Sequence, residues 1–151
     1  MIYWNQPYLL RLTEKSMKTG YSMRLRVLVA DDDEVFRALI CDIVRQQGYE
    51  PLEAANGKQA IDLFFGGLEP DLVILDVMMP VYDGWEVLSE IRAHSDAPVM
   101  MLTALGDEQN EVAGLQHGAD DYLAKPFRYA VFVARLNVLL RKTTREQTGL
   151  L

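Results

Sequence analysis

The sequence predicts an α/β domain built on a doubly wound parallel sheet, in which five strands alternate with five helices. Two observations predict this class. Short runs of bulky apolar residues, typical of strands buried on both faces, alternate with segments whose apolar residues recur at helical spacing. Such alternation implies right-handed crossovers and a parallel sheet covered by helices on both faces.

The predicted elements follow one another from residue 26 onward. Strands are expected at 26–30, 49–54, 72–75, 98–102 and 122–124. Helical spacing of apolar residues covers 35–44, 60–64, 85–91, 106–116 and 131–140. Gly48, Gly66 and Gly118 stand where helices are expected to stop. One domain is therefore expected over 24–142, followed by a polar tail at 143–151 that has no period.

Composition excludes several classes of protein. The chain has 151 residues, half of them apolar, which is enough for one domain with a full core. No apolar run reaches the roughly 18 residues of a membrane span, and no secretion signal is recognisable. Cys41 is the only cysteine, so a disulfide or cysteine-rich metal site within the chain is excluded, and a buried thiol is expected. We expect a cytoplasmic protein.

Charge divides the chain into two parts. The net charge is −7, yet residues 1–26 hold five basic residues and one acidic residue, so the remainder carries −11. An acidic domain argues against nucleic-acid binding and is compatible with binding a divalent cation. Residues 1–23 fit no element of the domain. They are read as a flexible or cloning-derived arm, as an extension upstream of a start at Met23, or as an arm that packs on a partner chain.

Polar residues stand at the carboxyl end of four predicted strands. Asp31 and Asp32 follow the first strand, Asp76 the third, Thr103 the fourth and Lys125 the fifth. Parallel strands bring these ends to one edge of the sheet, where open α/β sheets bind ligands. Three carboxylates at one edge repel each other, and a divalent cation with oxygen ligands relieves the repulsion. With a hydroxyl and an ammonium group alongside, the set is suited to phosphoryl transfer onto Asp76.

These residues resemble the receiver domain of two-component response regulators, and the last third resembles the OmpR/PhoB subfamily. The resemblance covers about 26–141 and rests on the motifs Val27–Asp33, Leu75–Pro80 with Asp83-Gly84, Met101–Ala104 and Gly118–Phe127. It implies a (βα)5 sheet with strand order 2-1-3-4-5. It also implies a signalling switch that takes a phosphoryl group from a sensor histidine kinase onto Asp76 and loses it by slow hydrolysis. Catalysis would be limited to these self-directed steps.

The resemblance assigns further roles to residues around Asp76. Asp32, Asp31 and the carbonyl of Met78 would bind Mg²⁺ or Mn²⁺ together with Asp76. Thr103, Lys125 and the backbone N–H groups of Met78 and Ala104 would hold the phosphoryl group. Thr103 and Tyr122 would form a switch pair, and the Lys125–Pro126 peptide bond would be cis.

Partner surfaces follow from the same resemblance. The kinase would dock near Val35, Phe36, Pro126 and Phe127, although Val35 and Phe127 could equally be core residues. A homodimer through the fourth helix, fifth strand and fifth helix would use Asp120, Asp121 and Arg135. Glu111 replaces the usual basic residue at that face and Val131 the usual glutamate, which weakens the expected dimer.

Three alternatives to the switch can be compared with the sequence. A pseudo-receiver, an interaction module without phosphoryl turnover, is the main one. An aspartyl-nucleophile phosphatase would need a second acid just after Asp76, and Val77 and Met78 offer none. A flavin-binding domain would need phosphate-cradling loops, and acidic strand ends would repel its phosphate. His94 and His117 each lie near a helix end and receive no catalytic role.

Overall fold

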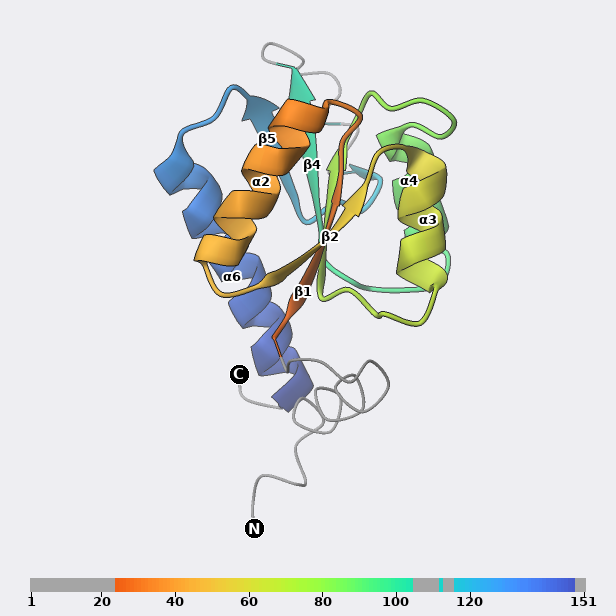
Figure 1. Cartoon of the computed structure of the whole chain (residues 1–151). Coiled ribbons are helices and arrows are strands. Elements are labelled where there is room, and N and C mark those ends of the chain that lie inside the picture. The colour runs from red at the N-terminus through yellow and green to blue at the C-terminus, as the bar shows by residue number, and fades with distance from the viewer. Residues whose placement is uncertain (1–23, 105–111, 113–115, 149–151) are drawn as a thin grey trace.

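A five-stranded parallel sheet forms the centre of the molecule, with the strand order β2-β1-β3-β4-β5 (Figure 1). The structure, a computed structural model, describes residues 24–104, 112 and 116–148. The strands are β1 (Arg26–Ala30), β2 (Glu50–Ala54), β3 (Leu72–Asp76), β4 (Val99–Ala104) and β5 (Asp121–Lys125). The helices are α2 (Glu34–Gln46), α3 (Gly57–Phe65), α4 (Gly84–Arg92) and α6 (Tyr129–Thr148). The predicted fold class and strand order are confirmed.

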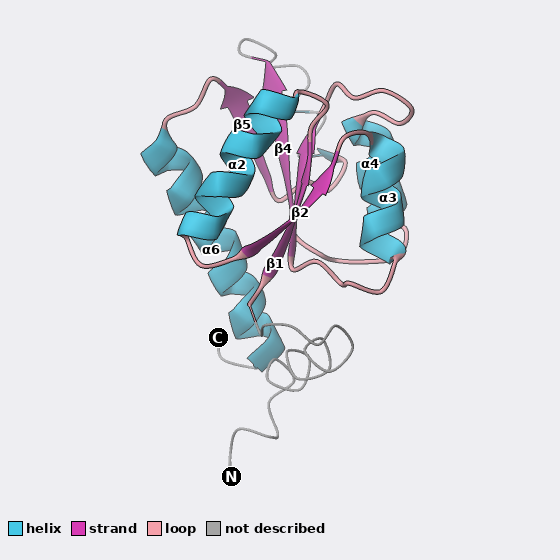
Figure 2. Ribbon diagram, viewed as in Figure 1, coloured by secondary structure: helices cyan, strands magenta, loops and turns pink. Residues whose placement is uncertain are grey.

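Helices cover both faces of the sheet. Figure 2 shows α2 and α6 on one side, with α3 and α4 on the other. Alternate strand residues divide between two cores: Val27 and Val29 pack with α2 and α6, whereas Leu28 and Ala30 pack with α3 and α4. Because successive side chains of a strand point to opposite faces, a strand covered on both faces must be apolar throughout. All five residues of β3 are buried. The first four are apolar, and the last is Asp76.

Three helices begin with a side-chain cap. Asp33, Asn56 and Asp83 each accept a hydrogen bond from the backbone N–H group three residues later, at the start of α2, α3 and α4. A cap of this kind satisfies one of the N–H groups that the first turn leaves unpaired. The caps fix where each loop ends and each helix begins, so the N-termini of these helices lie at the same edge as the strand ends that precede them.

The structure differs from the sequence-based prediction at the end of the domain. The last helix was expected to finish before residue 143, but α6 continues to Thr148. The polar composition of 143–148 is typical of a tail, but the segment includes neither proline nor glycine, so nothing in it interrupts the helix. The helix predicted at 106–116 lies mostly outside the described residues. Over the described part of the chain, no helix is both long and apolar enough to cross a bilayer.

Candidate functional site

Three carboxylates converge where β1 and β3 end. Asp31 directly follows β1 and is 1% exposed, Asp32 is exposed, and Asp76 closes β3 at 8% exposure. One oxygen atom of each of the three residues lies within 4.8 Å of the others. The convergence predicted from the strand ends is therefore present.

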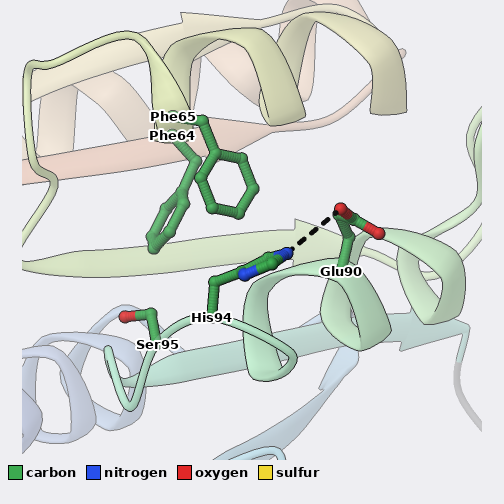
Figure 3. Close-up of a pocket in the computed structure, with 5 residues that line it drawn as sticks. All are labelled: Phe64, Phe65, Glu90, His94 and Ser95. Atoms are coloured by element: carbon green, nitrogen blue, oxygen red, sulfur yellow. Dashed lines mark ion pairs between the residues drawn. The ribbon is translucent and has the colours of Figure 1, made fainter.

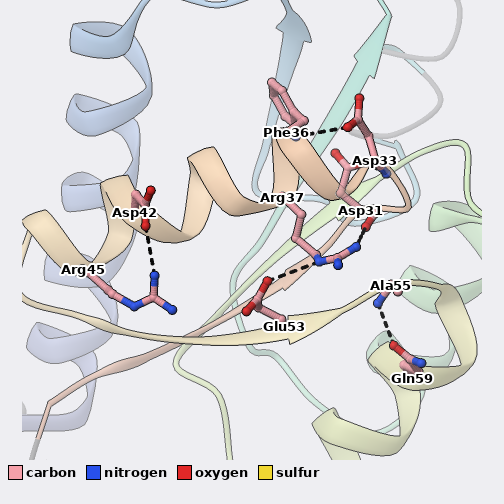
Figure 4. Close-up of polar contacts among 9 residues, drawn as sticks. All are labelled: Asp31, Asp33, Phe36, Arg37, Asp42, Arg45, Glu53, Ala55 and Gln59. Atoms are coloured by element: carbon pink, nitrogen blue, oxygen red, sulfur yellow. Dashed lines mark hydrogen bonds and ion pairs between the residues drawn. The ribbon is translucent and has the colours of Figure 1, made fainter.

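Asp31 is held by four sets of contacts. Its Oδ2 accepts a hydrogen bond from Lys125 Nζ at 2.8 Å, and its Oδ1 accepts one from the backbone N–H of Asp33 at 2.9 Å. Its backbone N–H donates to the Ala54 carbonyl at 3.1 Å. Its own carbonyl accepts from Arg37 Nη1 at 2.8 Å, as Figure 4 shows. A buried carboxylate is tolerated only when it is paired, and these contacts also set its orientation.

Lys125 joins the two buried carboxylates. Its Nζ is 2.8 Å from Asp31 Oδ2 and 3.5 Å from Asp76 Oδ1. The same ammonium group lies 4.1 Å from the centroid of the Phe36 ring, a distance at which the ring face attracts a cation. The Lys125–Pro126 bond is cis, as predicted. The ammonium group is thus placed against both carboxylates and restrained by an aromatic ring.

The charge on Asp76 is disfavoured by its surroundings. Burial is the main cause that raises the pKa of the Asp76 carboxyl, to about 6 from 3.8. The charge of Asp31 raises this pKa further, and Lys125 opposes the increase. A carboxylate with a higher pKa is a stronger base and stays ionised for the most part at neutral pH. The site therefore holds a buried carboxylate whose charge an additional cation would stabilise.

The remaining predicted site residues lie at the same edge. Thr103 is 3% exposed and Ala104 is exposed, at the end of β4. Tyr122 is 7% exposed on β5, where it pairs in register with Met101. The side chain of Met78, two residues beyond Asp76, is 74% exposed. Thr103 and Ala104 are thus the last two residues of β4, which runs beyond the expected end at residue 102, and Met78 follows β3. Tyr122 occupies a buried position.

The residues present fit a small divalent cation. Mg²⁺ takes oxygen ligands at roughly 2.0–2.1 Å, so ligand oxygens on opposite sides of the ion are about 4.2 Å apart. The separation of up to 4.8 Å among oxygens of Asp31, Asp32 and Asp76 requires only a small contraction. The ligand set consists of oxygens alone, which is the preference of Mg²⁺ and Mn²⁺.

Two positions that shape the site were not foreseen from the sequence. Arg37 ties α2 to the Asp31 carbonyl and also contacts Glu53 Oε1 at 3.3 Å. A Cβ atom added at Gly84 would collide with the Asp76 carbonyl oxygen and would lie 2.9 Å from Val77 Cα. The residue types alone do not predict these contacts, because the contacts depend on how each loop folds back beside the helix that follows it.

Comparisons with known proteins agree with this geometry. Residues 27–137 match the model of the response regulator receiver domain. The chain is 44% identical over 125 residues to the response regulator MprA of Mycolicibacterium vanbaalenii, covering 82% of this chain and 54% of MprA. It is 41% identical over 118 residues to the transcriptional regulatory protein CpxR of Escherichia coli, covering 78% of this chain and 50% of CpxR. Its structure matches the receiver domain of Francisella response regulator 1452 with a TM-score of 0.73 and 35% identity, covering 79% and 98% of the two chains.

The chain belongs to the response regulator receiver domain family. The relatives it matches are of the OmpR/PhoB type, as the resemblance indicated. The chain spans about half the length of these curated relatives. The family assignment therefore concerns the receiver domain.

The charged residues predicted for a dimer face of this receiver domain make ion pairs within the chain. Arg135 Nη1 is 2.9 Å from Asp121 Oδ1, and Arg92 Nη2 is 2.8 Å from Asp120 Oδ2. Asp120 Oδ2 also accepts a hydrogen bond from the backbone N–H of Val99 at 2.8 Å. Val131 is 37% exposed, whereas Glu111 lies outside the described residues.

The residues expected at a kinase-docking surface are partly exposed. Val35 is 80% exposed, which removes it from the core. Phe36 and Phe127 are half-buried and contact each other edge to face, with ring centroids 5.7 Å apart. Pro126 is exposed. Apolar side chains thus lie beside the carboxylate site, on the side of α2 and β5.

One described hollow lies away from the carboxylates. Its volume is about 460 Å³, and Figure 3 shows its lining of Phe64, Phe65, Glu90, His94 and Ser95. His94 Nε2 lies 3.7 Å from Glu90 Oε1, and its ring meets Phe65 edge to face with centroids 5.6 Å apart. These residues come from the ends of α3 and α4 and include no functional group of the receiver site. His94 thus contacts both an acidic side chain and an aromatic ring in this hollow.

Proposed function

We propose that this receiver domain is a phosphorylation-dependent switch that accepts a phosphoryl group on Asp76 from a phosphohistidine of a sensor kinase. One observation carries the proposal: Lys125 Nζ lies within 3.5 Å of Asp76 in a site where carboxylate oxygens of Asp31, Asp32 and Asp76 lie within 4.8 Å of one another. Such a site supplies a nucleophile, a fixed cation and oxygen ligands for a divalent ion. The partner and the cytoplasmic location belong to the same proposal.

Transfer would be a direct displacement at phosphorus. A carboxylate oxygen of Asp76 forms the new O–P bond while the P–N bond to the donor imidazole breaks, and the electron pair of that bond stays on the imidazole nitrogen. With a pKa of about 6, Asp76 is ionised in about nine molecules of ten at pH 7. The nucleophile is therefore available without a separate general base.

The neighbouring residues would receive the transferred group. Lys125 already contacts both buried carboxylates, so a small movement of its flexible side chain would bring the ammonium group to the phosphoryl oxygens. The hydroxyl of Thr103 and the backbone N–H groups of Met78 and Ala104 would donate further hydrogen bonds. The burial of Tyr122 beside β4 is compatible with a switch pair between its ring and Thr103.

Asp31, Asp32, Asp76 and the carbonyl of Met78 would hold Mg²⁺ or Mn²⁺. When bound, the ion offsets the negative charge of the carboxylates and of the phosphoryl oxygens. Ala104 is small and exposed at the end of β4, so water retains access to the site. Slow hydrolysis of the aspartyl phosphate would then reset the switch.

The test is phosphoryl uptake from acetyl phosphate in the presence of Mg²⁺, measured by intact-protein mass. The wild-type chain should gain one phosphoryl group and Asp76→Asn none. Asp33→Asn is a matched control, because asparagine preserves the helix cap while removing a carboxylate from the same acidic run. If Asp76→Asn still takes up a phosphoryl group, Asp76 is not the acceptor. If Asp33→Asn loses uptake and Asp76→Asn does not, the assignment of the acceptor to Asp76 is likewise contradicted.

The pseudo-receiver alternative has no support, since Asp31, Asp32, Asp76, Thr103 and Lys125 are all present at one sheet edge.

A homodimer through the β5 and α6 face stays a proposal. Asp121 and Arg135 already pair within the chain, so dimer formation would have to exchange that contact for one across subunits. Sedimentation of the protein with Mg²⁺ and beryllofluoride tests this, and the expected result is weak association.

A further inference from the structure

In the loop between β3 and α4, residues 77–83, one residue has a backbone conformation that is unfavourable for its type of side chain. Val81 has a φ of 72°, in the left-handed region. This φ is unfavourable for a β-branched residue, because the branched side chain crowds the backbone. The backbone N–H of Tyr82 donates to the Pro80 carbonyl at 3.0 Å and closes a γ-turn around Val81. Turns of this kind with positive φ are rare and strained.

Side-chain packing does not explain the strain. The side chain of Val81 is 65% exposed, so its own burial offsets little of the cost. Backbone contacts hold the turn instead, since the Pro80 carbonyl also accepts a hydrogen bond from the Gly57 N–H at 3.4 Å. A Cβ atom at Gly57 would collide with the Tyr82 carbonyl, so the first residue of α3 fits against the turn only as glycine.

The strained turn is connected directly to the carboxylate site. At the start of the loop, the Val77 N–H donates to the Leu102 carbonyl at 2.9 Å and the Val77 carbonyl accepts from Gly84 at 2.8 Å. Met79 is 8% exposed and anchors the middle of the loop in the core. The ring of Pro80 fixes its own φ. A change of backbone conformation at Val81 must therefore be absorbed over the few residues that follow Asp76.

We propose that Val81 is a positioning residue whose strained turn weakens the affinity of the site for its divalent cation. The inference rests on the proposed function, in which the Met78 carbonyl is a cation ligand. The metal-free protein would hold the loop conformation described here in only part of its molecules, and apparent affinity falls in proportion to the competent fraction. For a residue other than glycine, the cost of the left-handed conformation lowers the population of molecules that adopt it by a factor of roughly 5–30.

The test is Mg²⁺ titration of Val81→Asn, followed by tryptophan emission. Asparagine adopts positive φ more readily than valine and lacks the extra freedom of glycine. The dissociation constant for Mg²⁺ should fall roughly three- to tenfold. In the metal-free protein, hydrogen exchange at the Tyr82 and Gly84 amides should slow by a similar factor.

Two controls separate this mechanism from general effects. Val81→Thr keeps the β-branch and removes the exposed apolar surface, so its Mg²⁺ affinity should match that of the wild type. Glu69, at the other end of β3, also has a positive φ, of 51°. Glu69→Asn relieves strain far from the carboxylates, so it should raise the thermal midpoint and leave Mg²⁺ affinity unchanged.

The outcomes are distinguishable. If Val81→Asn binds Mg²⁺ no more tightly than a wild type that does bind Mg²⁺ and takes up phosphoryl groups, the role of Val81 is wrong and the proposed function stands. If Val81→Thr or Glu69→Asn tightens binding equally, strain at Val81 is not the cause. A wild type that binds no Mg²⁺ overturns both the inference and the proposed function.

Discussion

Replacing Asp76 with asparagine should stabilise the metal-free protein at neutral pH. The Asp76 side chain is almost fully buried, and that burial raises its pKa to about 6. In the unfolded chain the same carboxyl ionises near 3.8. At neutral pH the folded state therefore carries a charge that its surroundings disfavour, whereas asparagine keeps a similar shape without the charge.

The magnitude follows from the two pKa values. Below about pH 3 the carboxyl is largely neutral in both states and costs almost nothing. Between about pH 3 and 6 the folded state binds more protons than the unfolded state, so the free energy of unfolding falls as pH rises. Above about pH 6 the cost is complete, and a pKa raised from 3.8 to about 6 corresponds to about 3 kcal/mol.

The assay is urea unfolding of the wild type and Asp76→Asn with a chelator present, from about pH 3 to pH 8. The free energy of unfolding of the variant should match that of the wild type near pH 3 and exceed it by about 3 kcal/mol near pH 7.5. Saturating Mg²⁺ should close most of this gap, since a ligand at 100 times its dissociation constant stabilises by about 2.7 kcal/mol. A difference that stays constant with pH, or a variant less stable at pH 7.5, would refute the reasoning.

Three further predictions follow from contacts around the site. Lys125→Met should lower the free energy of unfolding by about 1–3 kcal/mol, because it removes the ammonium partner of buried Asp31. The same substitution should raise the pKa of Asp76 further, which an NMR titration would measure. Arg37→Met should cost about 1–2 kcal/mol in denaturant unfolding by releasing the Asp31 carbonyl; no loss would mean that water replaces the guanidinium without cost. Gly84→Ala should cost about 1–3 kcal/mol and slow phosphoryl uptake from acetyl phosphate, because its Cβ meets the Asp76 backbone; a fully active, equally stable variant would contradict this packing.

The fold and the convergence of polar residues at one sheet edge can be predicted from the sequence because both depend on local patterns. An apolar run of strand length followed at once by a carboxylate, as at Leu72–Asp76, indicates both a buried strand and its functional end. The proximity of residues at the ends of parallel strands can be predicted without knowing the geometry of their side chains. This is why Asp31, Asp76 and Lys125 were brought together correctly.

Local patterns failed where the deciding contact is not local. The end of α6 was placed too early, because a polar segment of 143–148 has no apolar period, although nothing in it interrupts a helix. Asp121 and Arg135 are predicted to lie at a dimer face, and within the chain they form an ion pair. Charge and position do not predict this pairing, which depends on the distance between the two side chains.

The sequence by itself determined the alternation of strands and helices and the chemical groups at the strand ends. Periodicity and residue type suffice for these, since they follow from backbone geometry and from the cost of burying charge. Tertiary structure decided how these groups are tuned: the raised pKa of Asp76, the contact of Arg37 with the Asp31 carbonyl, and the left-handed turn at Val81. Each of these depends on burial or on the geometry of a particular contact, which residue type and periodicity do not encode.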